Sequence, residues 1–179
     1  AKFDLIGWSS ALATPQRNLT AEIVSELDGT LDAVADDCRR IGIGHVELRM
    51  MLSRRHSDAL RQAVFAHLAE GCAARSDAAL QMRIAVSLTR GAAHRDTDWL
   101  GELMTGPAGA WITAVDFCHL EEAHPPKRDA AFAEWLQGFN QQYPERALAL
   151  LYHVGETFRD KSLESAVRWC HEAAGLGAH

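Results

Sequence analysis

The chain has 179 residues, of which 47% are hydrophobic and 23% are charged, and its formal net charge is -6. Length and composition are typical of one globular domain with its own core. No basic stripe indicates nucleic-acid binding, no stretch approaches the roughly 20 apolar residues that cross a bilayer, and the first residues lack signal-peptide architecture. We therefore expect a cytoplasmic protein, in which the 4 cysteines, none in a CxxC pair, are reduced.

Short apolar runs alternate with longer amphipathic stretches along the chain. In chain order this pattern predicts a helix at 20–41, a strand at 45–50, a helix at 56–74, a strand at 82–88, a short helix at 99–104, a strand at 111–117, a helix at 129–141, a strand at 146–152 and a helix at 161–174. Gly29 weakens the middle of the first helix, so two shorter pieces are an alternative there. The last helix carries an apolar stripe of the kind that faces a core, made of Leu163, Ala166, Val167 and Cys170.

Strand–helix units in series predict an α/β fold with a parallel sheet and right-handed crossovers. Two architectures fit this order, an open doubly wound sheet and part of a TIM-type (β/α)8 barrel. A complete barrel needs about 200 residues or more, and typically about 250. The chain therefore has too few strands to close a barrel by itself.

Polar residues gather at the carboxyl ends of the predicted strands. They are Glu47 and Arg49, Ser87 and Arg90, Asp116 and His119, and His153 and Glu156. In a parallel sheet these ends share one rim, which is where α/β proteins bind ligands. A neutral imidazole there can ligate a transition metal, and a carboxyl group beside it can carry a proton.

Each of these residues also has a structural interpretation. Glu47 and Arg49 can pair with charges on neighbouring strands, Asp116 can cap a loop, and a histidine at a strand end is often a hydrogen-bonded core residue. Cys118 beside His119 resembles a nucleophile and its base, but adjacent strand residues point to opposite faces of a sheet.

Four blocks of the sequence point to a known family. The blocks are Val46 to Arg49, Arg83 to Arg90, Val115 to Glu121, and His153-Val154-Gly155-Glu156. In order and spacing they resemble strands of the adenosine deaminase family, zinc-dependent (β/α)8 amidohydrolases, and the last block is similar to the family's His-Ala-Gly-Glu motif. Followed by Thr157 and Phe158, it is also similar to the adenosine-deaminase-like proteins of bacterial phage defence.

The resemblance implies a zinc cofactor and a role for each matching residue. His153 matches a zinc ligand, and Glu156 matches the catalytic acid that protonates the purine ring. Gly155, Asp116 and His119 match the substrate-binding positions. His119 stands where the family has a glycine, so we expect a reshaped base pocket. The implied reaction is the hydrolytic deamination of adenosine or a related adenine nucleoside or nucleotide.

Several family elements have no counterpart in the sequence. There is no His-x-His near the start and no counterpart of the paired aspartates of the family's last strand, and His179 aligns just before the family's Arg-Ile-Gly-His-Gly. We therefore expect residues 1–179 to be a partial barrel domain of about four βα units, completed by the rest of its own barrel or by another subunit, and oligomeric. The alternative is a catalytically inactive deaminase-like barrel that serves as a scaffold or interaction subunit.

Overall fold

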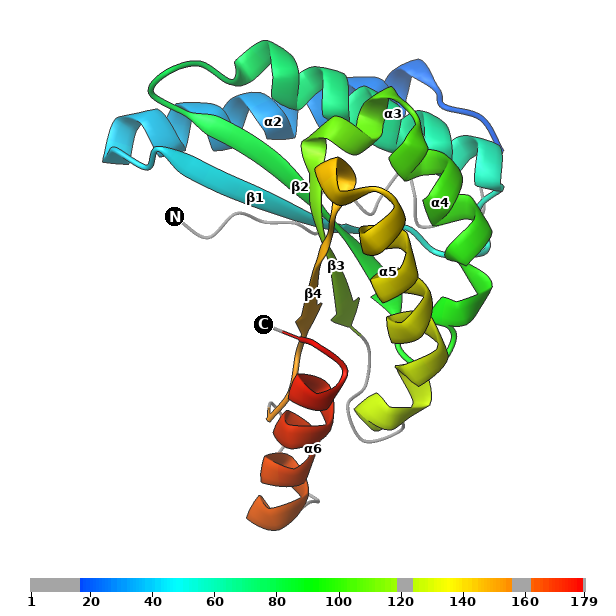
Figure 1. Cartoon of the computed structure of the whole chain (residues 1–179). Coiled ribbons are helices and arrows are strands. Elements are labelled where there is room, and N and C mark those ends of the chain that lie inside the picture. The colour runs from blue at the N-terminus through cyan, green and yellow to red at the C-terminus, as the bar shows by residue number, and fades with distance from the viewer. Residues whose placement is uncertain (1–16, 119–123, 156–161, 179) are drawn as a thin grey trace.

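A parallel sheet with strand order β1-β2-β3-β4 runs through the protein (Figure 1). The computed structural model describes residues 17–118, 124–155 and 162–178. The strands are β1 (His45–Met51), β2 (Gln81–Thr89), β3 (Ile112–Cys118) and β4 (Ala149–Tyr152). The α-helices are α2 (Ala21–Ile41), α3 (Asp58–Arg75), α4 (Thr97–Thr105), α5 (Ala130–Gln142) and α6 (Leu163–Gly175). The predicted series of βα units with a parallel sheet is confirmed.

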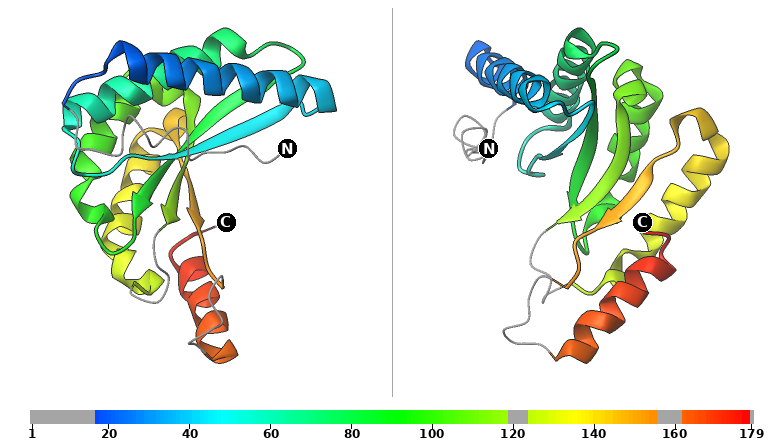
Figure 2. Two further views of the ribbon diagram at one scale, coloured as in Figure 1. Left: turned by 180° about the vertical axis from the view of Figure 1, so that it is seen from behind. Right: turned by 90° about the vertical axis from the view of Figure 1, so that its left-hand side faces the viewer.

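The strands lie side by side in the order in which they occur along the chain. Figure 2 shows the helices along one face of the curved sheet. A doubly wound sheet reverses its strand order at a switch point and carries helices on both faces. The four described strands contain no such reversal. Right-handed crossovers between successive neighbours therefore all place their helices on the same face.

The chain returns to the sheet after α6. Ala178 forms an isolated parallel bridge with Leu150 of β4, on the edge opposite β3. The segment after α6 therefore begins at the position that a further parallel strand would occupy next to β4.

Local signals account for where the helices begin and end. The Thr20 hydroxyl accepts a hydrogen bond from the Ile23 amide (3.3 Å), and Ser57 plays the same part for α3. Gly42 closes α2 in the left-handed conformation, with φ of 76°. Exposed Gly29 does not divide α2, which is one continuous helix of 21 residues, because the apolar stripe on its opposite face is buried throughout.

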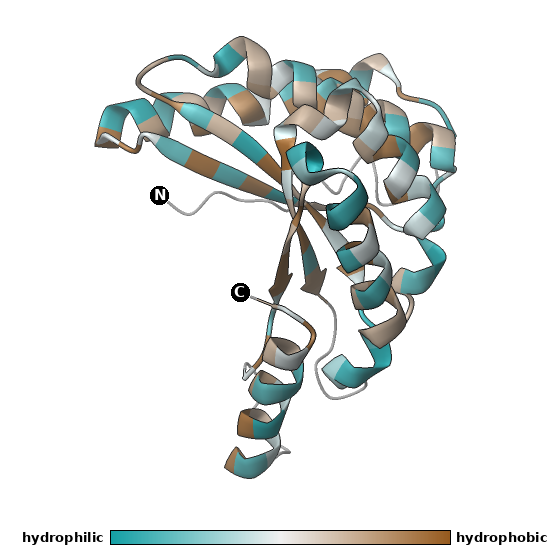
Figure 3. Cartoon of the chain, in the orientation of Figure 1, coloured by the Kyte–Doolittle hydropathy of each residue, from teal (hydrophilic) through white to brown (hydrophobic). Residues whose placement is uncertain are grey.

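The core lies between the sheet and its helices. Val115 and Phe117 of β3 point into it, and the Phe117 ring meets that of Phe132 in α5 edge-to-face at 5.2 Å. Figure 3 shows hydrophilic and hydrophobic residues alternating along β1 and β2, and the helices also carry both kinds of residue. Because side chains alternate across a strand, Asp116 lies on the other face, away from these helices. Among the described residues, no helix combines the length and apolar character needed to cross a bilayer.

Two predicted elements need correction. The strand predicted at 146–152 begins only at Ala149, because Pro144–Arg146 form a 3₁₀ turn. Leu148 is held instead by the Asn140 side chain, which accepts from its amide and donates to its carbonyl, both at 2.9 Å.

In α6 the predicted stripe is largely wrong, since Leu163 and Val167 are 71% and 47% exposed and Cys170 is also exposed. The helix buries Ala166, Trp169 and Ala173 instead. This face of the helix is the one that meets the rest of the fold.

Candidate functional site

His153 lies directly after β4, at the carboxyl end of the sheet, and is fixed to β3 through both backbone and ring. Its amide donates to the Phe117 carbonyl at 3.4 Å, and its ring Nδ1 lies 3.1 Å from the same oxygen. A carbonyl oxygen only accepts hydrogen bonds, so Nδ1 carries the proton and Nε2 of the neutral ring keeps its lone pair. A metal-binding histidine needs this tautomer, with its other ring nitrogen oriented by a carbonyl or carboxylate.

Asp116 lies beside this ring with its side chain almost fully buried. The Ser87 hydroxyl donates to Oδ2 at 3.2 Å, across the aligned pair that the two residues form between β2 and β3. Oδ1 lies 3.2 Å from His153 Nδ1, close enough for an ion pair, but the ring N–H points toward Phe117 and makes no hydrogen bond with it. Among the described groups, Oδ1 is therefore a buried carboxylate oxygen without a hydrogen-bond donor.

The guanidinium of Arg49 faces both groups from β1. Its Nη1 lies 3.4 Å from His153 Nε2 and 3.7 Å from Asp116 Oδ1. Arg49 thus provides positive charge next to a buried carboxylate, which fits the structural interpretation of cross-strand pairing. Glu47 does not share in this contact, because its carboxylate accepts a 2.6 Å hydrogen bond from the Thr113 hydroxyl.

A zinc ion requires three or four ligands. His153 fits one of these positions by its tautomer, and Asp116 Oδ1, which accepts no hydrogen bond from the described groups, lies 3.2 Å from its ring. Within residues 17–118, 124–155 and 162–178, no group of three or more histidine, cysteine, aspartate or glutamate side chains is arranged to hold a metal ion. The described residues therefore supply part of a zinc site at most.

The structure describes only some of the other predicted site residues. Gly155 follows His153 with φ of 76°, a left-handed conformation that favours glycine, so the chain turns sharply after the histidine. Glu156 and His119 lie outside the described residues. Their assigned roles, and the roles of Gly155 and Asp116 in substrate binding, stay predictions.

Cys118 is a poor nucleophile in this setting. Its sulfur lies 3.3 Å from the Met51 sulfur and 3.8 Å from the Leu88 carbonyl. Burial raises the pKa of the thiol, and the nearby negative charge of Asp116 raises it further. Reactive cysteines have lowered pKa values, so the raised pKa of Cys118 argues against its thiol as an attacking group.

Sequence reasoning missed two residues that hold the end of β4. The Tyr152 hydroxyl donates to Asp129 Oδ2 at 2.6 Å, and Asp129 is buried at the start of α5. Burial, together with this hydrogen bond, raises the pKa of Tyr152. In the sequence Asp129 looks like an ordinary first residue of a helix. The only local signal is the pair Pro125 and Pro126 before it, whose rings restrict the backbone that leads into the helix.

No protein-family model and no curated protein matches the sequence. Among solved structures, a family 18 chitinase from Crocus vernus is similar at 10% sequence identity and a TM-score of 0.44. The match covers 92% of this chain and 57% of the chitinase, so the chain spans little more than half the length of that protein. A likeness of this size carries no argument about function.

Proposed function

We propose that this chain contributes to a (β/α)8 barrel of the adenosine deaminase type, with His153 as a zinc ligand. The reaction is the hydrolytic removal of the amino group from adenosine or a related adenine nucleoside or nucleotide. The observation that carries the proposal is the His153 ring, whose Nδ1 faces the Phe117 carbonyl and whose Nε2 is left as an acceptor at the carboxyl end of β4. The four sequence blocks that resemble the family support it.

The arrangement of the strands supports the barrel. The strands follow one another in sequence order with their helices on one face, as in a (β/α)8 barrel. Ala178 pairs with Leu150 at the position where the next strand of such a barrel would begin. Its catalytic residues would lie at the carboxyl ends of the strands, where His153 lies.

Each residue of the proposed site has its own role in the reaction. Zinc, when bound, makes hydroxide available near neutral pH. His153 binds the metal, and the Phe117 carbonyl with buried Asp116 keeps its ring oriented. Glu156 gives a proton to the purine ring nitrogen. Asp116 and His119 contact the substrate, and the remaining zinc ligands come from outside the described residues.

Part of the surface of this chain also suits a partner. The apolar side chains of Leu163 and Val167 are exposed on α6, and within the described part of the chain β1 has a strand neighbour on one edge only. Unpaired strand edges and exposed apolar side chains favour association. We propose that the rest of its own barrel or another subunit covers them in an oligomer.

The test is deamination by the full-length natural protein, measured as inosine formation from adenosine, deoxyadenosine and their phosphates, with zinc content determined in parallel. Glu156→Gln should keep the metal and abolish turnover, whereas His153→Ala should lose both. The matched control is His171→Ala, because His171 is exposed on α6 and should change neither. Near-normal turnover by Glu156→Gln would refute the role assigned to Glu156.

A second candidate is a barrel that has lost its metal and acts as a scaffold or interaction subunit. One observation favours it, because the Arg49 guanidinium lies 3.4 Å from His153 Nε2, where a bound cation would otherwise lie. A folded full-length protein without zinc and without turnover on any of these substrates would support the scaffold. Stoichiometric zinc with inosine formation would reject it.

A further inference from the structure

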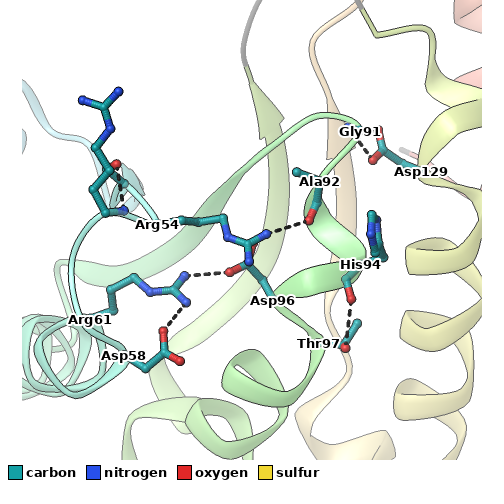
Figure 4. Close-up of polar contacts among 11 residues, drawn as sticks. Arg54, Asp58, Arg61, Gly91, Ala92, His94, Asp96, Thr97 and Asp129 are labelled. Carbon is teal, nitrogen blue, oxygen red and sulfur yellow. Dashed lines mark hydrogen bonds and ion pairs between the residues drawn. The ribbon is translucent and has the colours of Figure 1, made fainter.

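The loop that follows β2 is fixed from two directions. On one side, Arg61 of α3 donates to Asp96 at 2.8 Å and Arg54 donates to the Ala92 carbonyl at 3.2 Å (Figure 4). On the other side, the Gly91 amide donates to Asp129 Oδ1 at 2.8 Å. Arg90 is the first residue of this loop, so its backbone has little freedom to move.

The Arg90 side chain reaches from this loop to the end of β4. It is only 1% exposed, and its Nη2 donates to the backbone carbonyl of His153. Its guanidinium also lies over the Tyr152 ring, 4.9 Å from the centroid. The Tyr152 hydroxyl in turn donates to Asp129, which holds Gly91 next to Arg90. These contacts form a closed circuit between β2, β4 and the start of α5.

The charges of this circuit explain why an arginine is needed. Burying a guanidinium is unfavourable unless it is paired, and Arg90 Nε and Nη1 have no hydrogen-bond partner among the described groups. The buried carboxylate of Asp129, which accepts from the Tyr152 hydroxyl and the Gly91 amide, adds a negative charge to the same circuit. Only a planar cation can stack on an aromatic face and donate at its edge at the same time, so lysine cannot reproduce this contact.

We propose that Arg90 is a positioning residue for His153. By fixing the His153 carbonyl and the ring of the preceding Tyr152, it holds the imidazole against the Phe117 carbonyl and so keeps Nε2 as the acceptor. That this acceptor binds zinc rests on the function proposed above. The tether itself is a property of the fold and can be measured without turnover.

The experiment compares Arg90→Met and Arg90→Lys with Arg83→Met in the full-length natural protein. Arg83 is a matched control, because it lies in β2, which Arg90 directly follows, and its guanidinium also lies over an aromatic ring, 4.6 Å from the centroid of Trp111. Two readouts are used, hydrogen exchange of the His153 amide and the zinc affinity measured by competition with a chelator. Outer-shell partners of metal-binding histidines typically change metal affinity by about 10- to 100-fold.

Arg90→Met should raise the exchange rate at His153 by at least about tenfold and weaken zinc binding within that range. Arg90→Lys should lie between it and the natural protein, and Arg83→Met should change neither readout. If Arg90→Met does not fold, Tyr152→Phe provides the test, because it removes only the link to Asp129 and should raise the exchange rate more modestly.

Unchanged exchange in Arg90→Met, or an equal rise in Arg83→Met, would overturn the positioning role. A selective rise in exchange in a protein that binds no zinc would uphold the tether and would instead overturn the proposed function. The two proposals therefore fail separately.

Discussion

Replacing Asp96 by asparagine should destabilise the protein strongly, because it removes the buried partner of the buried Arg61 guanidinium. Asp96 and Arg61 are 1% and 4% exposed, and their ion pair is 2.8 Å long. Removing one partner of a buried pair typically costs roughly 3–5 kcal/mol. Arg61 keeps its contact with Asp58 and its position over the Trp99 ring, so we expect a cost of about 3 kcal/mol, at the low end of that range. Urea denaturation measures it as a lower unfolding midpoint.

The matched control for this prediction is Asp58→Asn. Asp58 pairs with the same guanidinium at 2.6 Å, but its side chain is 73% exposed, so its loss should cost no more than about 1 kcal/mol. A third variant that replaces Arg61 and Asp96 together by methionine and leucine should recover most of the loss, since the charges that lose a partner, on Asp58 and Arg54, are accessible to solvent. Equal and small costs for Asp96→Asn and Asp58→Asn would refute the reasoning.

Three further predictions concern packing, capping and pH. Gly109→Ala should destabilise the protein by roughly 1–3 kcal/mol, because a Cβ there would collide with the Met104 carbonyl. Gly138→Ala, in an open part of α5, should stabilise it by up to about 1 kcal/mol, and the melting temperatures of the two variants should differ in that order. Ser57→Ala should cost about 1 kcal/mol in urea denaturation, because the Ser57 hydroxyl caps α3. Burial raises the pKa of Cys72 from 9.0 to about 11, so the unfolded thiol ionises first, and stability present below pH 9 is lost as the pH rises toward 11. Cys72→Ala should remove that part of the pH dependence, on the order of 2 kcal/mol, and an unchanged slope would contradict the assignment.

The elements that sequence alone predicted well are those whose signal is local and repeated. The spacing of Ile23, Leu27, Leu31, Val34 and Cys38 predicted the buried face of α2, and all of them are buried. A single glycine on the exposed face could not outweigh that stripe. The predicted strands at 45–50 and 82–88 are each confirmed to within one residue at either end, because an apolar residue stands at every second position of both segments, the period of a strand.

Elements that depend on distant partners were predicted less well. The strand at β4 is shorter than expected because Asn140, eight residues before Leu148, takes over its hydrogen bonds. In α6 the sequence offers two apolar faces, one through Leu163 and Val167 and one through Ala166 and Trp169. Helical periodicity is the same for both, so only the surface that the helix meets decides between them.

The same division holds for the candidate site. Residue type and position at a strand end were enough to single out His153 and Asp116 from the sequence, because polar groups at the carboxyl end of buried strands are conspicuous. Tertiary structure alone decided that the His153 ring faces the Phe117 carbonyl, that the Ser87 hydroxyl donates to Asp116, and that Arg90 holds the end of β4. These contacts join residues from 29 to 63 positions apart along the chain. Local pattern cannot encode them, since they arise only when strand register and loop geometry bring the partners together.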